Sequence, residues 1–204
     1  MAHLLSSLAE GDSILTFPLE LTHRRPPYDK PDFLLSMGGT KIGIEHTEAR
    51  SRNETHKDVL RCKEGIGPSV YFIAPVEPSE PKRCARQLRE EIEANDSMGG
   101  WGDQDNTDRK WSNVMFSVIN TKQKKLQTPE FSRYDEDWLL IRDAWPFPSV
   151  DLKNATGHLF LQIRDRNIKL EFDRVFIIRC SDRGPVCEIA EHGFTFHPRN
   201  DLWL

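Results

Sequence analysis

The spacing of hydrophobic residues predicts a strand hairpin in the first quarter of the chain. Residues 32–36 and 41–47 are strand-like apolar runs, separated by Met-Gly-Gly-Thr at 37–40. Gly-Gly between two such runs favours a two-residue turn, because a type I′ turn needs a positive φ at both central positions. With the two glycines at the centre of the turn, the ladder places Asp32 directly opposite Glu45.

Further patterns predict the rest of the fold. Strands are expected at 69–76, 138–141, 174–178 and 186–190, and helices near the N-terminus, from about 53, from 79, over 109–125 and over 152–164. The stretch 96–108 is rich in Gly, Asn and Asp, which predicts a loop. Trp111, Met115 and Val118 share one face of the helix at 109–125, and three lysines occupy its last turn.

This order of elements predicts an α/β protein with a mixed central β-sheet flanked by helices. A length of 204 residues favours a single domain over 1–204. No apolar run is long enough to cross a membrane, and the first ten residues lack the pattern of a signal peptide, so we expect a cytoplasmic protein. The 28 basic and 32 acidic residues give a net charge of −4, which argues against nonspecific coating of nucleic acid but permits a local basic groove.

Strand alternation in the hairpin gathers chemistry on one face of the sheet. Asp32, Glu45 and Thr47 share that face, whereas His46 points to the opposite one. Two directly opposed carboxylates repel each other and destabilise a sheet unless a cation relieves the repulsion. Carboxylate oxygens are ligands that Mg²⁺ or Mn²⁺ prefers, with waters and substrate phosphates completing the shell. The alternative is that one carboxylate points to solvent, or that each is paired with a nearby arginine.

The sequence Pro31-Asp32, followed by a short turn and an apolar strand ending in Glu45-His46-Thr47, resembles the core motif of the PD-(D/E)xK nuclease superfamily. The resemblance implies a restriction-endonuclease-like core in which Asp32 and Glu45 bind Mg²⁺ or Mn²⁺ and the backbone carbonyl of His46 is a further ligand. Thr47 stands where the family has a lysine that assists the attacking water, and Thr carries no positive charge.

The same resemblance raises the question of which groups complete the site. The family often uses an acidic residue from a preceding helix, for which Glu20 is the best placed candidate, and Glu48 is a second candidate. Arg50, Lys57 or Lys63, from the segment after the hairpin, could replace the missing lysine. Three basic clusters could hold a phosphate backbone: Arg24-Arg25, Lys82-Arg83-Arg86-Arg89 and Lys122-Lys124-Lys125.

Two other patterns have simpler interpretations. His46 and His56 flank the hairpin region, but no third His or Cys stands at a zinc-ligand spacing, so we expect packed or hydrogen-bonded histidines. Asp143 follows the buried strand at 138–141 and is expected to lie on the surface. The sequence therefore predicts a Mg²⁺- or Mn²⁺-dependent nuclease that hydrolyses phosphodiester bonds of DNA or RNA. The alternative is a catalytically inactive scaffold of that fold that binds nucleic acid or a protein partner.

Overall fold

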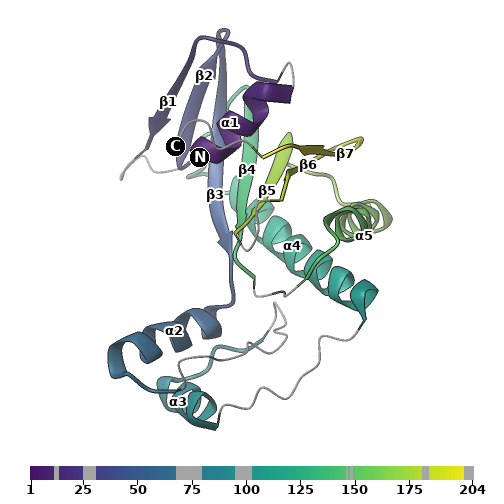
Figure 1. The fold of residues 1–204 in the computed structure, drawn as a ribbon. Helices are drawn as coiled ribbons and strands as arrows, with labels where there is room; N and C mark the ends of the chain where they lie inside the picture. Colours follow the sequence, from purple (N-terminus) through teal and green to yellow (C-terminus); the bar gives the residue numbers. More distant parts are fainter. Residues whose placement is uncertain are drawn as a thin grey trace.

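The computed structural model describes residues 1–11, 14–24, 31–67, 80–94, 103–145, 147, 149–180 and 184–199. Within these residues the chain forms one seven-stranded mixed sheet and five helices, an α/β arrangement in a single domain (Figure 1). The predicted fold class is confirmed at this level. No helix among the described residues has both the length and the hydropathy needed to span a membrane.

The order of the strands in the sheet follows their order in the chain. They are β1 (Leu19–His23), β2 (Phe33–Met37), β3 (Thr40–Ala49), β4 (Glu136–Asp143), β5 (Arg174–Arg179), β6 (Val186–Ala190) and β7 (Gly193–His197). The first three strands form an antiparallel meander, β3, β4 and β5 run parallel, and β6 and β7 return antiparallel. The parallel centre is buried on both faces, as expected for strands that are covered by helices.

Helices cover the two faces of this sheet (Figure 1). Helix α1 (Ala2–Gly11) packs Leu4 and Leu8 onto one face, against Ile44 and Trp138. Helices α4 (Gln104–Leu126) and α5 (Leu152–Asp165) pack together on the opposite face, in a cluster that includes Leu139 and Ile177. Two apolar cores therefore lie on opposite sides of the same strands.

A smaller pair of helices lies beyond the end of β3, away from the sheet (Figure 1). Helix α2 (Arg52–Glu64) begins at the N-cap Ser51, whose side chain accepts the Glu54 N–H, and ends at Gly65 with a φ of 64°. It packs on α3 (Ala85–Ala94) through a separate cluster of Leu60, Leu88 and Ile92.

The hairpin that carries the predicted site has the predicted register. Gly38 and Gly39 have φ values of 57° and 86°, and Met37 pairs with Thr40. The ladder between β1 and β2 continues for one more residue, where the Arg24 N–H donates to the Asp32 carbonyl at 2.9 Å. Asp32 therefore lies directly before the first residue of β2, close to the position that the turn chemistry predicts.

Several predicted elements differ from the structure. Helix α4 begins at Gln104 within the predicted loop, because the Asp103 side chain caps it by accepting the Asn106 N–H at 2.8 Å. Helix α3 begins at Ala85 rather than at 79. Strand β7 was not predicted, although Phe194 and Phe196 have strand alternation. The strand predicted at 69–76 lies outside the described residues.

Candidate active site at the end of strand β3

Glu45 and Lys122 form a nearly buried ion pair between the sheet and α4. Glu45 lies on the α4 face of β3, and Lys122 Nζ donates to its Oε1 at 2.7 Å. The two side chains are only 10% and 14% exposed, respectively. The other carboxylate oxygen, Oε2, makes no hydrogen bond to a described residue. Glu45 is therefore held by one cation and keeps one oxygen available.

The position of Lys122 follows from the hydrophobic stripe of α4. Trp111, Met115 and Val118 recur at four- and three-residue spacing, and Lys122 follows at the next four-residue step. This stripe faces the sheet, so the ammonium group is carried to the face where Glu45 lies. Sequence reasoning placed Lys122 in a basic cluster but did not connect it with Glu45. A lysine in register with a buried stripe was the available signal.

The cations that were predicted to replace the missing lysine are engaged elsewhere or point to solvent. Arg50 forms an ion pair with Asp58. Lys57 donates to Glu54 at 2.8 Å and lies 2.9 Å from Glu91, and these contacts raise its pKa against the lowering effect of burial. Lys63 is exposed on α2. The prediction of a replacement from this segment is not supported by the contacts, whereas Lys122 contacts Glu45 directly.

Asp32 contacts the same stretch of β3 from the neighbouring strand. Its Oδ2 accepts the backbone N–H of His46 at 2.6 Å, so the carboxylate lies beside the residue that follows Glu45. Directly opposed residues in an antiparallel ladder have Cβ atoms about 4.5–5.5 Å apart. Asp32 forms no ion pair with an arginine that the structure describes. The alternative of two arginine-paired carboxylates is thus wrong for both residues.

The His46 side chain lies on the opposite face of the sheet, as the alternation predicts. It lines a cavity with Met1 and His3 at the start of α1. Burial lowers the pKa of His46, and the nearby Asp32 carboxylate opposes this only in part. The imidazole therefore lies away from Glu45. The role predicted for the His46 carbonyl stays a prediction.

Gly43 allows the chain before Asp32 to pack tightly on the sheet. A Cβ atom at Gly43 would lie 2.8 Å from Tyr134 Cδ2, and 2.9 Å from both Asp137 Oδ1 and Pro31 Cγ. Only a glycine leaves room for these three groups, since real Cβ atoms do not make such contacts. Pro31 directly precedes Asp32, so this packing helps to fix the position of the Asp32 side chain.

A cleft of about 420 Å³ is lined by Lys122, the partner of Glu45. One wall is α4, including Ser117, Thr121 and Lys122, and the floor is the end of β3 at Thr47. The other wall is the beginning of α2 together with residues 80–82 of the segment before α3. Ligands of open α/β sheets bind at the carboxyl ends of parallel strands, which is where this cleft lies.

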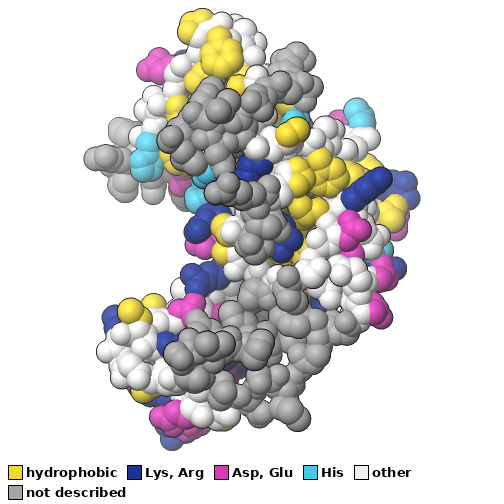
Figure 2. Space-filling model, viewed as in Figure 1, with side chains coloured by type: hydrophobic (Ala, Val, Ile, Leu, Met, Phe, Trp, Pro, Cys, Tyr) yellow, Lys and Arg dark blue, Asp and Glu magenta, His cyan; other side chains and the backbone are white. Residues whose placement is uncertain are grey.

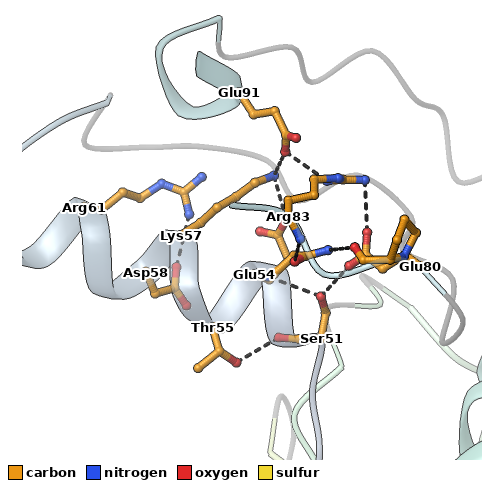
Figure 3. A network of polar contacts seen from close by, with 11 residues as sticks. Ser51, Glu54, Thr55, Lys57, Asp58, Arg61, Glu80, Arg83 and Glu91 are labelled. Atoms are coloured by element: carbon orange, nitrogen blue, oxygen red, sulfur yellow. Dashed lines mark hydrogen bonds and ion pairs between the residues drawn. The ribbon is translucent and has the colours of Figure 1, made fainter. Parts of the chain in front are cut away.

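A polar network holds the second wall of the cleft in place (Figure 3). Ser51 donates to Glu80 at 2.8 Å, and the Asn53 side chain bonds the Pro81 carbonyl and the Arg83 N–H, both at 3.0 Å. Arg83 bridges Glu80 and Glu91. The segment before α3 is thus fastened to the first turn of α2.

The remaining predicted acidic residues have different positions. Glu20 is on β1 rather than on a helix, and it pairs with Ser36, four residues along the strand from Asp32. At about 3.3 Å per residue this is roughly 13 Å away, so Glu20 does not contribute to the site. Glu48 lines the cleft but is paired with Arg142 at 3.1 Å. Thr47 lines the cleft on the same sheet face as Glu45, as predicted.

The expected surface position of Asp143 is wrong. Asp143 ends β4 and is buried. It accepts the Trp111 indole N–H at 2.7 Å and the Trp145 backbone N–H at 3.0 Å, and it lies 3.5 Å from Arg179. These contacts bind α4 and the loop after β4 to the sheet, which is a structural role.

The three basic clusters also differ from one another. Arg24 donates to the Tyr134 hydroxyl, and Arg25 lies outside the described residues. In the second cluster the arginines are paired with Glu80, Glu91, Glu90 and Glu64, which leaves Lys82 as the member that lines the cleft. In the third, Lys122 points to Glu45, and Lys124 and Lys125 are exposed.

Metal-ligating side chains do not form a preassembled cage: the described part of the chain has no group of three or more His, Cys, Asp or Glu placed to hold a metal ion. Comparison of the sequence with family models and curated proteins, and of the structure with solved structures, finds no match. The chemistry of the site therefore has to be argued from its own residues.

Proposed function

We propose that the chain is a divalent-metal-dependent nuclease with a restriction-endonuclease-like core, whose active centre comprises Asp32, Glu45 and Lys122. The observation that carries the proposal is the 2.7 Å contact between Lys122 Nζ and Glu45 Oε1. The sequence motif lacks a lysine at Thr47, and this contact supplies an ammonium group from α4 to the carboxylate of the motif. The missing charge was the main argument for an inactive scaffold.

The donor atoms suit the metal that the motif implies. Asp32 and Glu45 each keep one carboxylate oxygen without a hydrogen bond to a described residue. Mg²⁺ and Mn²⁺ favour such hard oxygen donors, and Mg²⁺ commonly uses only one or two carboxylates together with waters and substrate phosphates. When bound, the metal supplies a Lewis acid that polarises a phosphoryl oxygen and lowers the pKa of a water ligand.

The protein's own groups would then divide the remaining work. Lys122 donates hydrogen bonds and positive charge to the oxygens that become more negative as the phosphodiester is attacked. The His46 N–H fixes the orientation of Asp32 through the 2.6 Å hydrogen bond. Thr47 offers a neutral hydroxyl beside Glu45 for orienting a water or a phosphate oxygen.

Titration calorimetry with Mn²⁺ tests the metal site. The wild type is expected to bind one Mn²⁺, and Asp32→Asn and Glu45→Gln are expected to lose that binding because each removes a charged ligand. Asp135→Asn is the matched control, since Asp135 lies on the loop before β4 and bonds the Lys41 N–H. Asp32→Asn and Glu45→Gln variants that fold and bind Mn²⁺ as tightly as the wild type would contradict the proposal.

A further inference from the structure

The cleft beside Glu45 contains two cations with no acidic partner. Arg52, in the first turn of α2, and Lys82, in the segment before α3, both line it. Both side chains are exposed, and neither makes an ion pair or side-chain hydrogen bond with any residue in the described part of the chain. In the space-filling view, dark blue side chains lie beside magenta ones at the level between the sheet and the α2–α3 pair (Figure 2).

The acidic side chains in the cleft do not cancel these charges, because they already have cations of their own. Glu48 lies 3.1 Å from Arg142, and Glu80 lies 3.1 Å from Arg83 and accepts the Ser51 hydroxyl. The lining is therefore positive, although the whole chain has a net charge of −4. A cleft of one sign concentrates ligands of the opposite sign.

Trp145 brings an unsatisfied polar atom to the wall of the cleft. It is 6% exposed and lines the same cleft, and its indole Nε1 is a buried donor without a hydrogen-bond partner among the described residues. Leaving such a donor unsatisfied costs about 1–3 kcal/mol. The Nε1 atom has almost no exposed surface, so an acceptor oxygen of a ligand, such as a phosphate oxygen, would become its partner only if the indole turned toward the cleft.

The size of the cleft limits the size of the anion that can enter it. Its volume of about 420 Å³ is enclosed between α4 and the beginning of α2. That volume lies in the range of pockets that surround a small ligand, about 300–1,000 Å³. A duplex, whose major groove alone is about 12 Å wide, is too broad to enter. A single strand can insert one nucleotide at a time.

We infer that this cleft binds single-stranded nucleic acid, with one backbone phosphate held between Arg52 and Lys82. The strand then passes Thr47 and reaches the Glu45–Lys122 pair. The choice of nucleic acid among anionic ligands rests on the proposed function, whereas the positive lining does not. Arg52 and Lys82 are substrate-positioning residues and do not touch the reacting phosphate.

Fluorescence anisotropy in EDTA measures this binding without hydrolysis. The probes are a labelled 12-nucleotide single strand and the matching duplex, titrated with wild type and with Arg52→Ala/Lys82→Ala at several salt concentrations. The wild type is expected to prefer the single strand. The double variant is expected to bind it about tenfold more weakly, with a salt slope smaller by about 0.7, since the neutralisation of one phosphate is lost.

Lys153→Ala/Arg164→Ala is the matched control, because it removes the same charges from the exposed side of α5. An unchanged salt slope in the Arg52→Ala/Lys82→Ala variant, equal affinity of the wild type for the duplex, or no binding to either probe would overturn the inference. Binding as expected, without hydrolysis in Mn²⁺, would refute the proposed nuclease and leave the inference standing. Hydrolysis with normal binding by the Arg52→Ala/Lys82→Ala variant would refute the inference alone.

Discussion

Two buried glutamates lie on opposite faces of the same sheet, and their partners differ. Glu188 on β6 has both oxygens occupied: Arg174 donates to Oε1, and His197 Nε2 lies 2.7 Å from Oε2. Glu45 on β3 has only Oε1 occupied, by Lys122. A cavity borders each glutamate's network, so access to solvent does not distinguish them.

The difference separates a structural carboxylate from one that can take another ligand. A fully satisfied buried network stabilises one conformation and gains nothing from a further ligand. A carboxylate with one free oxygen, next to a cleft whose lining is positive, can accept a metal without losing a protein contact. By this criterion the site is on the α4 face of the sheet, and the Arg174–Glu188–His197 network supports the fold.

The largest effect on stability should come from the saturated network. Glu188→Gln leaves two former partners facing a neutral amide, so we expect the free energy of unfolding to fall by about 3 kcal/mol. Glu45→Gln should cost only about 1 kcal/mol, because only the single contact with Lys122 is weakened. Urea denaturation with linear extrapolation measures both variants. Equal losses in the free energy of unfolding of the two variants would contradict the distinction between the two glutamates.

Gly43→Ala should produce the next largest effect. Its Cβ would meet Tyr134, Asp137 and Pro31 at 2.8–2.9 Å, so we expect a loss of about 1–3 kcal/mol and a displaced Asp32. Gly157→Ala, in α5, is the matched control: no atom lies within 4 Å of its added Cβ, and alanine should stabilise the helix by about 0.5–1 kcal/mol. Thermal unfolding of the two variants shows whether each substitution stabilises or destabilises the protein. A neutral Gly43→Ala would contradict the close packing beneath the site.

The smallest effect concerns acid stability. Burial alone would raise the pKa of Glu188, but the hydrogen bonds from His197 and Arg174 outweigh it and hold that pKa below the ordinary 4.5. A lowered folded-state pKa contributes stability above pH 4.5 that is lost as the pH falls through the folded-state value. Glu188→Gln should therefore flatten the decline of stability just below pH 4.5.

A second carboxylate provides the reference for that pH profile. Asp105 is exposed, and its hydrogen bond with Arg109 is the main cause that lowers its pKa to about 2. Its contribution is lost between pH 3.8 and about 2, so the decline in this range should persist in Glu188→Gln. Urea denaturation at a series of pH values resolves the two ranges. If the pH profile of Glu188→Gln were the same as that of the wild type, the role given to Arg174 and His197 would be contradicted.

The sequence was most informative where local chemistry decides the structure. The Gly38-Gly39 turn determined the register of the hairpin, and with it the shared face of Asp32 and Glu45. It was least informative about contacts between distant segments. Lys122 is 77 positions from Glu45, and helical periodicity shows that it faces the core but not which strand it meets.

The mistaken predictions have the same origin. Glu20 was placed near the site by analogy, but the pairing of β1 with β2 carries it along the sheet and away from Asp32. Asp143 was expected at the surface because it ends a strand, and the indole of Trp111 from α4 buries it. Both outcomes depend on tertiary neighbours that one sequence does not specify.

The central claim is that Lys122 supplies the positive charge that the motif lacks at Thr47. The most direct test is the rate of Mn²⁺-dependent hydrolysis of a labelled single-stranded oligonucleotide by wild type, Lys122→Met and Lys125→Met, with folding checked by circular dichroism. Lys125 lies in the same last turn of α4 and is exposed. We predict cleavage by wild type and Lys125→Met, and a loss of about 100-fold or more in Lys122→Met. No cleavage by the wild type, or equal rates for all three proteins, would contradict the account.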